Sequence, residues 1–188
     1  QVAREIQESI LPRQLPLLTQ GSLGAHMKPA KVVGGDFYDV IQLDENKLGL
    51  VVGDVSDKGM HAAIFMAMVR SLFRAEAGRS LSPESVLNAV NEHLLGMNDS
   101  SMFVTMLYGV FDLETRRFSY ARAGHDLPLC CDGQRLPIEL PKGTGMIMGI
   151  FPQPDLDIGS LQLEPGSALL LFTDGATDMT NPDGELFG

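Results

Sequence analysis

Three aspartates follow apolar runs in this sequence, and their type and positions favour binding of a metal ion. Asp36 follows Val-Val-Gly-Gly, Asp54 follows Val-Val-Gly, and Asp174 follows Leu-Leu-Leu-Phe-Thr. Because such runs usually belong to the core, a carboxylate at their end is costly unless a cation meets it. No run of Lys or Arg accompanies these acids. A ligand set made only of oxygen favours Mg²⁺ or Mn²⁺ as the cation.

Two of the aspartates are expected to face each other across a hairpin. Residues 32–43 and 47–55 have the composition of strands, and the polar residues 44–46 predict the turn between them. A turn centred on Glu45 places Asp36 opposite Asp54 on the same face, with Cβ atoms about 4.5–5.5 Å apart. Two carboxylates would repel each other there, and a shared divalent ion would remove the conflict. A slip of one residue would put them on opposite faces.

Each aspartate also has a structural interpretation that needs no metal. Asp36 could cap a turn in which the preceding Gly-Gly pair supplies positive φ. Asp54 could cap the helix that follows, a role that is also open to Ser56 and Asp57. Asp174 could begin an Asp-Gly turn. Taken together the three positions favour the metal interpretation, because all of them end apolar runs and two can lie face to face.

The periodicity of the apolar residues predicts helices at 3–11, 59–78 and 82–96. Pro12 ends the first of these, and the third has Ser82 as a candidate N-cap with Pro83 at its first position. Further strands are expected at 102–112, 116–123, 127–131, 134–140, 159–163 and 167–173, with a hairpin turn at Asp132-Gly133 and a loop over 141–157. Strands, then two helices, then more strands predict an α+β fold with antiparallel sheets.

Length, charge and cysteine usage limit the class of protein. The chain has 188 residues, enough for one domain with a sizeable core, and no run of about 18 apolar residues that would predict a membrane-spanning helix. Its net charge of −10 argues against non-specific binding to nucleic acid or anionic membranes. Cys130 and Cys131 are adjacent, a spacing that suits neither a disulfide nor a zinc site. With an N-terminus unlike a signal peptide, these features indicate a cytoplasmic protein.

A series of short motifs occurs in a fixed order along the chain. It comprises Gln-Glu-Ser-Ile-Leu-Pro at 7–12, Gly-Gly-Asp-Phe-Tyr-Asp at 34–39, Gly-Asp-Val-Ser-Asp-Lys-Gly at 53–59, Ala-Ala-Ile-Phe-Met at 62–66, Phe-Val-Thr-Met at 103–106, Ala-Gly-His at 123–125 and Thr-Asp-Gly at 173–175. This series resembles the PPM-type metal-dependent serine/threonine phosphatases, and within them the bacterial SpoIIE-like (RsbU-like) branch. The resemblance covers essentially the whole chain.

The resemblance implies a four-layer sandwich, in which two antiparallel β-sheets are flanked by α-helices. It also implies two Mn²⁺ or Mg²⁺ ions per active site. Asp54 would bridge both ions, Asp36 would hold one, Asp174 would hold the other, and the backbone carbonyl of Val55 would be a further ligand. In a site of this kind a metal-activated water attacks the phosphorus atom in line.

The same resemblance implies a phosphatase acting on phosphoserine or phosphothreonine, typically of an anti-anti-sigma (STAS) protein in a sigma-factor partner-switching pathway. Residues 1–12 would be the end of an N-terminal linker helix. Residues 13–188 would be the phosphatase domain, lacking its C-terminal end. A sensor domain in the same chain or a regulatory partner would control it, and a homodimer is an expected assembly. No nucleic-acid partner is expected.

Departures from the family's pattern leave a second interpretation open. The sequence does not contain the further metal-binding Asp that the family has near its C-terminus, and Ser56 stands where eukaryotic relatives have a His that is a candidate general acid. His125 is expected to be a hydrogen-bonded structural residue, and Asp39 and Asp57 are expected to be solvated or adjacent to the ligands. The alternative function is a catalytically silent regulatory interaction or dimerisation module of the same fold.

Overall fold

A five-stranded antiparallel sheet forms the centre of the molecule. The computed structural model describes residues 5, 7, 9–29, 32–97, 102–141 and 143–187. The strands of this sheet lie in the order β1-β2-β3-β4-β7, and every neighbouring pair is antiparallel. Their bounds are β1 Phe37–Gln42, β2 Lys47–Val55, β3 Val104–Asp112, β4 Arg117–Ala123 and β7 Asp157–Gln162.

A smaller antiparallel sheet has the order β6-β5-β8. Its strands are β5 Leu129–Cys131, β6 Pro137–Ile138 and β8 Ala168–Leu170. The predicted turn at Asp132-Gly133 is confirmed, because the Asp132 carbonyl accepts a hydrogen bond from the Arg135 N–H at 2.9 Å and β5 pairs with β6. Both cysteines are free thiols, as their spacing predicts.

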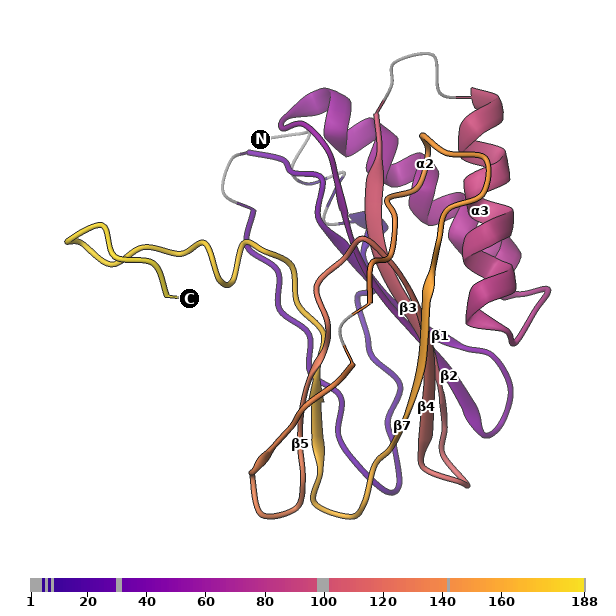
Figure 1. The fold of residues 1–188 in the computed structure, drawn as a ribbon, viewed down its shortest axis with the longest axis vertical. Helices are drawn as coiled ribbons and strands as arrows, with labels where there is room; N and C mark the ends of the chain where they lie inside the picture. The colour runs from indigo at the N-terminus through magenta and orange to yellow at the C-terminus, as the bar shows by residue number, and fades with distance from the viewer. Residues whose placement is uncertain are drawn as a thin grey trace.

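Two helices cover one face of the five-stranded sheet (Figure 1). They are α2 Met60–Ala77, which contacts β1 and β2, and α3 Pro83–Met97, which contacts β3 and β4. Each helix buries its apolar stripe against alternate residues of the strands. The core on this face includes Phe65, Met66, Val69, Phe73, Val86, Leu87, Val90 and Leu94 of the helices with Phe37, Val51, Tyr108 and Ala121 of the strands.

The two helices begin in different ways. The Ser82 hydroxyl accepts a hydrogen bond from the Ser85 N–H at 3.2 Å and α3 begins at Pro83, so the predicted N-cap is confirmed. Helix α2 follows Gly59, which has φ 91°, and no side chain caps it. The alternative interpretation, in which a side chain at position 54, 56 or 57 caps α2, is therefore not confirmed, because α2 begins directly after Gly59 without a side-chain cap.

The small sheet packs against the opposite face of the large one. Leu169 and Leu171 of the β8 segment join Val52, Leu107 and Phe118 in a second apolar cluster. The layers are therefore helices, large sheet, small sheet (Figure 1). The α+β class with two antiparallel sheets and flanking helices is confirmed. Within the described residues α2 and α3 both lie on the large sheet, so they show three of the four expected layers, without a helix layer over the small sheet.

The register between β1 and β2 is the predicted one. Phe37 pairs with Gly53 and Tyr38 with Val52, so Asp36, which directly precedes β1, lies opposite Asp54. The faces also agree, because Tyr38 and Val52 both belong to the cluster between the two sheets. The strand β1 is shorter than the expected range 32–43, because it covers Phe37–Gln42 and residues 32–36 contain no strand.

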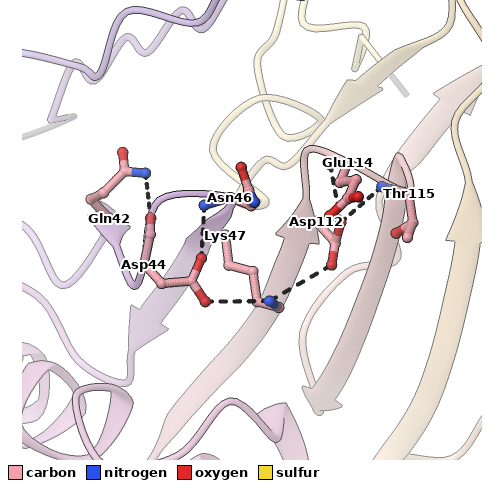
Figure 2. A network of polar contacts seen from close by, with 7 residues as sticks. All are labelled: Gln42, Asp44, Asn46, Lys47, Asp112, Glu114 and Thr115. Atoms are coloured by element: carbon pink, nitrogen blue, oxygen red, sulfur yellow. Dashed lines mark hydrogen bonds and ion pairs between the residues drawn. The ribbon is translucent and has the colours of Figure 1, made fainter.

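A polar network at the far end of the sheet fixes this register (Figure 2). The Asp44 carboxylate accepts a hydrogen bond from the Asn46 N–H at 2.8 Å and lies 3.3 Å from Lys47 Nζ. Lys47 Nζ also lies 3.8 Å from Asp112, whose carboxylate accepts hydrogen bonds from the N–H groups of the next turn. The β1–β2 and β3–β4 turns are thus joined, and the hairpin cannot shift without breaking this network.

Asp39 is buried beneath helix α2 and is not solvated as expected. It is 1% exposed, and its carboxylate lies 2.7 Å from Arg70 Nη2 and 2.9 Å from Arg74 Nη1. The alternation of the strand puts Asp39 on the face opposite to Asp36, where α2 supplies the two arginines. The expectation is therefore wrong, and Asp39 attaches α2 to β1.

The N-terminal residues that the structure describes are helical at Glu5, Gln7, Ser9 and Ile10, which agrees with the predicted helix. Residues 3, 4, 6 and 8 of that prediction lie outside the described residues. The side chain of Leu11 is buried in the core between the helices and the large sheet. Among the described residues, neither helix combines the length and hydropathy needed to cross a bilayer.

Candidate metal centre

The structure brings Asp36, Asp54 and Asp174 together. Each offers one carboxylate oxygen, and these three oxygens lie within 4.8 Å of one another. Asp36 precedes β1, Asp54 lies in β2, and Asp174 lies in the turn after β8. Two of the acids therefore lie at the β1–β2 hairpin of the large sheet, and the third follows the strand β8 of the small sheet.

The negative charge of these three carboxylates is only partly balanced by positively charged groups of the protein. Burial, followed by a hydrogen bond with Asp36 and the charges of Asp36 and Asp174, raises the pKa of Asp54 to about 7. Burial and the charges of Asp36, Asp178 and Asp126 also raise the pKa of Asp174. Lys58 acts in the opposite direction on Asp54, but it does not cancel the other effects. Three converging carboxylates with surplus negative charge are a donor set that fits a divalent cation.

Gly35 allows the loop before Asp36 to approach β2 closely. A Cβ atom at Gly35 would lie 2.4 Å from the Val55 carbonyl oxygen, so only glycine fits there. Neither Gly34 nor Gly35 has positive φ, and the expectation that they supply one is wrong. The Val55 carbonyl thus lies beside the residue that precedes Asp36.

The N-terminal helix reaches the same loop through Gln7, a contact that sequence reasoning missed. Gln7 is 3% exposed. Its Nε2 donates to the Gly34 carbonyl at 2.8 Å, and its Oε1 accepts from the Gly34 N–H at 3.1 Å. The only signal in the sequence is that Gln7 belongs to the first motif of the series, while its partner lies 27 residues away.

Asp174 occupies a turn as well as the cluster, so its two interpretations are compatible. The Asp174 carbonyl accepts a hydrogen bond from the Asp178 N–H at 2.7 Å. The preceding Thr173 hydroxyl donates to Asp36 Oδ2 at 3.1 Å. This bond ties the segment after β8 directly to the loop before β1.

His125 lies between the two sheets beside the cluster and is 4% exposed. Its Nδ1 lies 2.8 Å from the Thr105 hydroxyl and its Nε2 lies 2.9 Å from the Phe172 carbonyl. Burial lowers the pKa of His125, which favours the neutral ring. Gly124 has φ 62° and packs against Ile147, which explains a glycine before this histidine.

A pocket of about 570 Å³ opens beside the acids. Ser56 holds one wall, because its N–H donates to the Phe103 carbonyl and its hydroxyl accepts from the Phe103 N–H, both at 2.9 Å. Asp57 is exposed at the pocket with φ 78°. None of the described residues that line the pocket is Lys or Arg; they are Asp54, Ser56, Asp57, Phe103, Thr105, Gly124, His125, Asp126 and Asp174. A phosphate bound here would therefore depend on a cation for charge neutralisation.

The fold and the cluster together define a PP2C-like α+β domain, and comparison with solved structures shows the same architecture. The SiaA-PP2C domain of Pseudomonas aeruginosa is 27% identical, with a TM-score of 0.83 over 100% of this chain and 75% of that chain. The model of the Stage II sporulation protein E (SpoIIE) family matches residues 44–188. The chain belongs to the SpoIIE family.

Two relatives extend the match over nearly the whole chain. Protein IcfG of Synechocystis sp. is 35% identical over 98% of this chain and 33% of its own length. Phosphoserine phosphatase RsbU of Bacillus subtilis is 28% identical over 99% of this chain and 55% of its own length. The chain thus spans about a third to a half of these relatives.

Proposed function

We propose that this chain is a Mn²⁺- or Mg²⁺-dependent phosphoprotein phosphatase that hydrolyses phosphoserine or phosphothreonine. The observation that carries the proposal is the convergence of Asp36, Asp54 and Asp174 beside a pocket in a SpoIIE-family fold. The name of RsbU, a phosphoserine phosphatase, supports the reaction class.

Asp36, Asp54 and Asp174 would hold the cations, together with the Val55 carbonyl, and we propose two ions that share Asp54. When bound, divalent ions neutralise phosphate charge and lower the pKa of a water molecule beside them. The protein's own part is to fix the three carboxylates. Gly35 lets the Asp36 loop approach Val55, and Thr173 donates to Asp36 at 3.1 Å. Ser56 holds the Phe103 segment that forms the neighbouring wall of the pocket.

The substrate that we propose is a phosphorylated STAS-type protein in a partner-switching pathway in the cytoplasm. Family resemblance is the support for this choice. A folded phosphoprotein could present its phosphoserine to a pocket that lies beside the exposed residues Asp57 and Asp174. We propose residues 1–12 as the end of a linker helix and 13–188 as the phosphatase domain. A sensor domain or regulatory partner would act through the linker, whose Gln7 contacts Gly34, and a homodimer is the proposed assembly.

The experiment is hydrolysis of an aryl phosphate and of a phosphoserine peptide, with Mn²⁺, with chelator, and with Asp54→Asn. We expect turnover that needs Mn²⁺ and falls in the variant by more than about 100-fold, the upper range for losing an outer partner of a metal ligand. Asp183→Asn is the control, because Asp183 is exposed and belongs neither to the cluster nor to the lining of the pocket. Mn²⁺ binding without turnover would favour the silent regulatory module instead.

A further inference from the structure

The imidazole of His125 joins two segments that carry different acids of the cluster. It is buried, and each ring nitrogen has one hydrogen-bond partner. One partner is the Thr105 hydroxyl, and Thr105 pairs with Asp54 in the β2–β3 register. The other partner is the carbonyl of Phe172, which lies two residues before Asp174. The ring therefore spans from the strand beside Asp54 to the segment that leads into Asp174.

The chemistry of the two partners fixes the tautomer of this ring. A carbonyl oxygen can only accept, so Nε2 must carry the proton that is donated to Phe172. In the neutral ring Nδ1 then has a lone pair and accepts from the Thr105 hydroxyl. The hydrogen bonds run in one direction, from Thr105 through His125 to the backbone before Asp174.

The backbone of His125 is also held in place. The Arg122 guanidinium donates to the His125 carbonyl, donates to the Gly143 carbonyl at 3.0 Å, and forms an ion pair with Asp157. This arrangement attaches the histidine to the end of β4 and the start of β7. With its backbone carbonyl bonded to Arg122, the ring of His125 cannot change rotamer without breaking both of its hydrogen bonds.

We propose that His125 is a positioning residue that holds Asp174 close to Asp54, so that the cation site is formed before the cation arrives. This inference rests on the proposed function, because it assumes that the acids bind a divalent ion. Three carboxylates within 4.8 Å repel one another, and Asp174 belongs to an exposed turn that could otherwise move outward. The link through Thr105 and the bond from Thr173 to Asp36 resist that movement on two sides of the cluster.

The test compares Thr105→Val with Thr105→Ser. Valine keeps the volume but removes the hydroxyl donor, whereas serine keeps the donor. We expect Mn²⁺ affinity, measured by calorimetry on the full chain, to fall about 10- to 100-fold in the valine variant and to stay near wild type in the serine variant. Activity of the valine variant should recover in part at high Mn²⁺. Thr115→Val is the matched control, because Thr115 lies at the far turn of β3–β4 (Figure 2).

A second pair of variants tests the ring itself. His125→Gln can still donate to the Phe172 carbonyl and accept from Thr105, and should retain more Mn²⁺ affinity than His125→Phe, which can do neither. Nitrogen NMR of the wild-type chain with chelator should show the Nε2–H tautomer, a reading that needs neither metal nor turnover. The Nδ1–H tautomer would overturn the inference even if the variants fail to fold.

The outcomes separate this inference from the proposed function. If the wild-type chain binds Mn²⁺ and Thr105→Val and His125→Phe bind it equally well, the positioning role is refuted and the phosphatase proposal stands. If the variants lose thermal stability but keep Mn²⁺ affinity, the link is only structural and the inference is also refuted. If the wild-type chain binds no Mn²⁺, the metal site itself is wrong and both proposals fall.

Discussion

At the scale of single residues, the Asp54 carboxylate lowers the stability of the folded protein when it is ionised and no cation is bound. Burial and then Asp36 raise its folded-state pKa to about 7, whereas an unfolded Asp titrates near 3.9. A raised acid pKa means that the folded state binds the proton more tightly. The stability that this proton contributes is complete below about pH 4 and is lost as the pH rises through about 7.

Asp54→Asn should therefore stabilise the metal-free protein at pH 8, by about 1–2 kcal/mol after allowing for solvent screening. The amide has a similar shape and removes one charge from the cluster. The measurement is urea unfolding at pH 5 and pH 8 with chelator present. We expect the variant and wild type to differ little at pH 5, and saturating Mn²⁺ to reverse their order at pH 8. Lower stability of the variant at pH 8 without metal would contradict the assignment of repulsion to this cluster.

Two adjacent glycines offer a matched test of close approach. A Cβ atom at Gly35 would lie 2.4 Å from the Val55 carbonyl oxygen, whereas one at Gly34 would meet nothing nearer than 4.0 Å. We expect Gly35→Ala to cost about 1–3 kcal/mol in unfolding free energy and to weaken Mn²⁺ binding, because the Asp36 loop must move away from β2. Gly34→Ala should change the unfolding free energy by less than about 1 kcal/mol. If the two substitutions change the unfolding free energy equally, the close approach of Gly35 to Val55 is not the reason for a glycine at position 35.

At the scale of elements, the residues of the β1–β2 turn predict the strand register correctly, whereas the residues of the strands do not predict where β1 begins. The polar residues at 44–46 fix the β1–β2 register, because Asp44 bonds back to the turn and Lys47 joins it to Asp112. The start of β1 was misplaced because Val32 and Val33 have strand composition, although Val33 is buried in a loop. The burial of Asp39 was missed because its partners, Arg70 and Arg74, come from a helix whose position no local pattern reveals.

The residues of the site divide in the same way, into those that a local sequence pattern can place and those that it cannot. Asp36 and Asp54 could be placed face to face from one hairpin, which is a local inference. Asp174 could be joined to them only through family resemblance, since the small sheet lies far along the chain. The contacts of Gln7 with Gly34 and of His125 with Phe172 join segments 27 and 47 residues apart, and the sequence contains no periodic signal for either.

The N-terminal helix gives a prediction at this scale. Gln7 makes two hydrogen bonds with Gly34, and its replacement by Ala leaves the Gly34 N–H and carbonyl without those partners in a part-buried place. We expect Gln7→Ala to cost about 1–3 kcal/mol in unfolding free energy and to lower turnover at limiting Mn²⁺. Gln14→Ala is the control, because Gln14 is exposed. If the turnover of Gln7→Ala depends on Mn²⁺ concentration as that of wild type does, the contact between Gln7 and Gly34 does not influence the position of Asp36.

At the scale of the whole molecule, a bound cation would connect the two sheets. Asp36 and Asp54 come from the large sheet and Asp174 follows the small one, so an ion held by all three would resist their separation. Without the ion, the apolar cluster around Leu169 and Leu171, the His125 bridge and the Thr173 bond remain as links near this end of β8. The cation should therefore stabilise the small sheet and the turn that follows it against separation from the large sheet.

Hydrogen exchange can measure this coupling directly. With free Mn²⁺ at about 100 times its Kd, amides that exchange only when the sheets separate should slow by about 100-fold, which corresponds to about 2.7 kcal/mol. We expect this slowing over residues 168–178, and also in the interior of β3, because unfolding of the whole domain abolishes the cation site as well. Asp54→Asn should remove this Mn²⁺-dependent slowing, and without metal at pH 8 its amides should exchange more slowly than those of wild type, because the variant is then the more stable protein. If β3 slows but residues 168–178 exchange at the same rate with and without Mn²⁺, the small sheet opens while the cation site stays formed, and the cation does not hold the two sheets together.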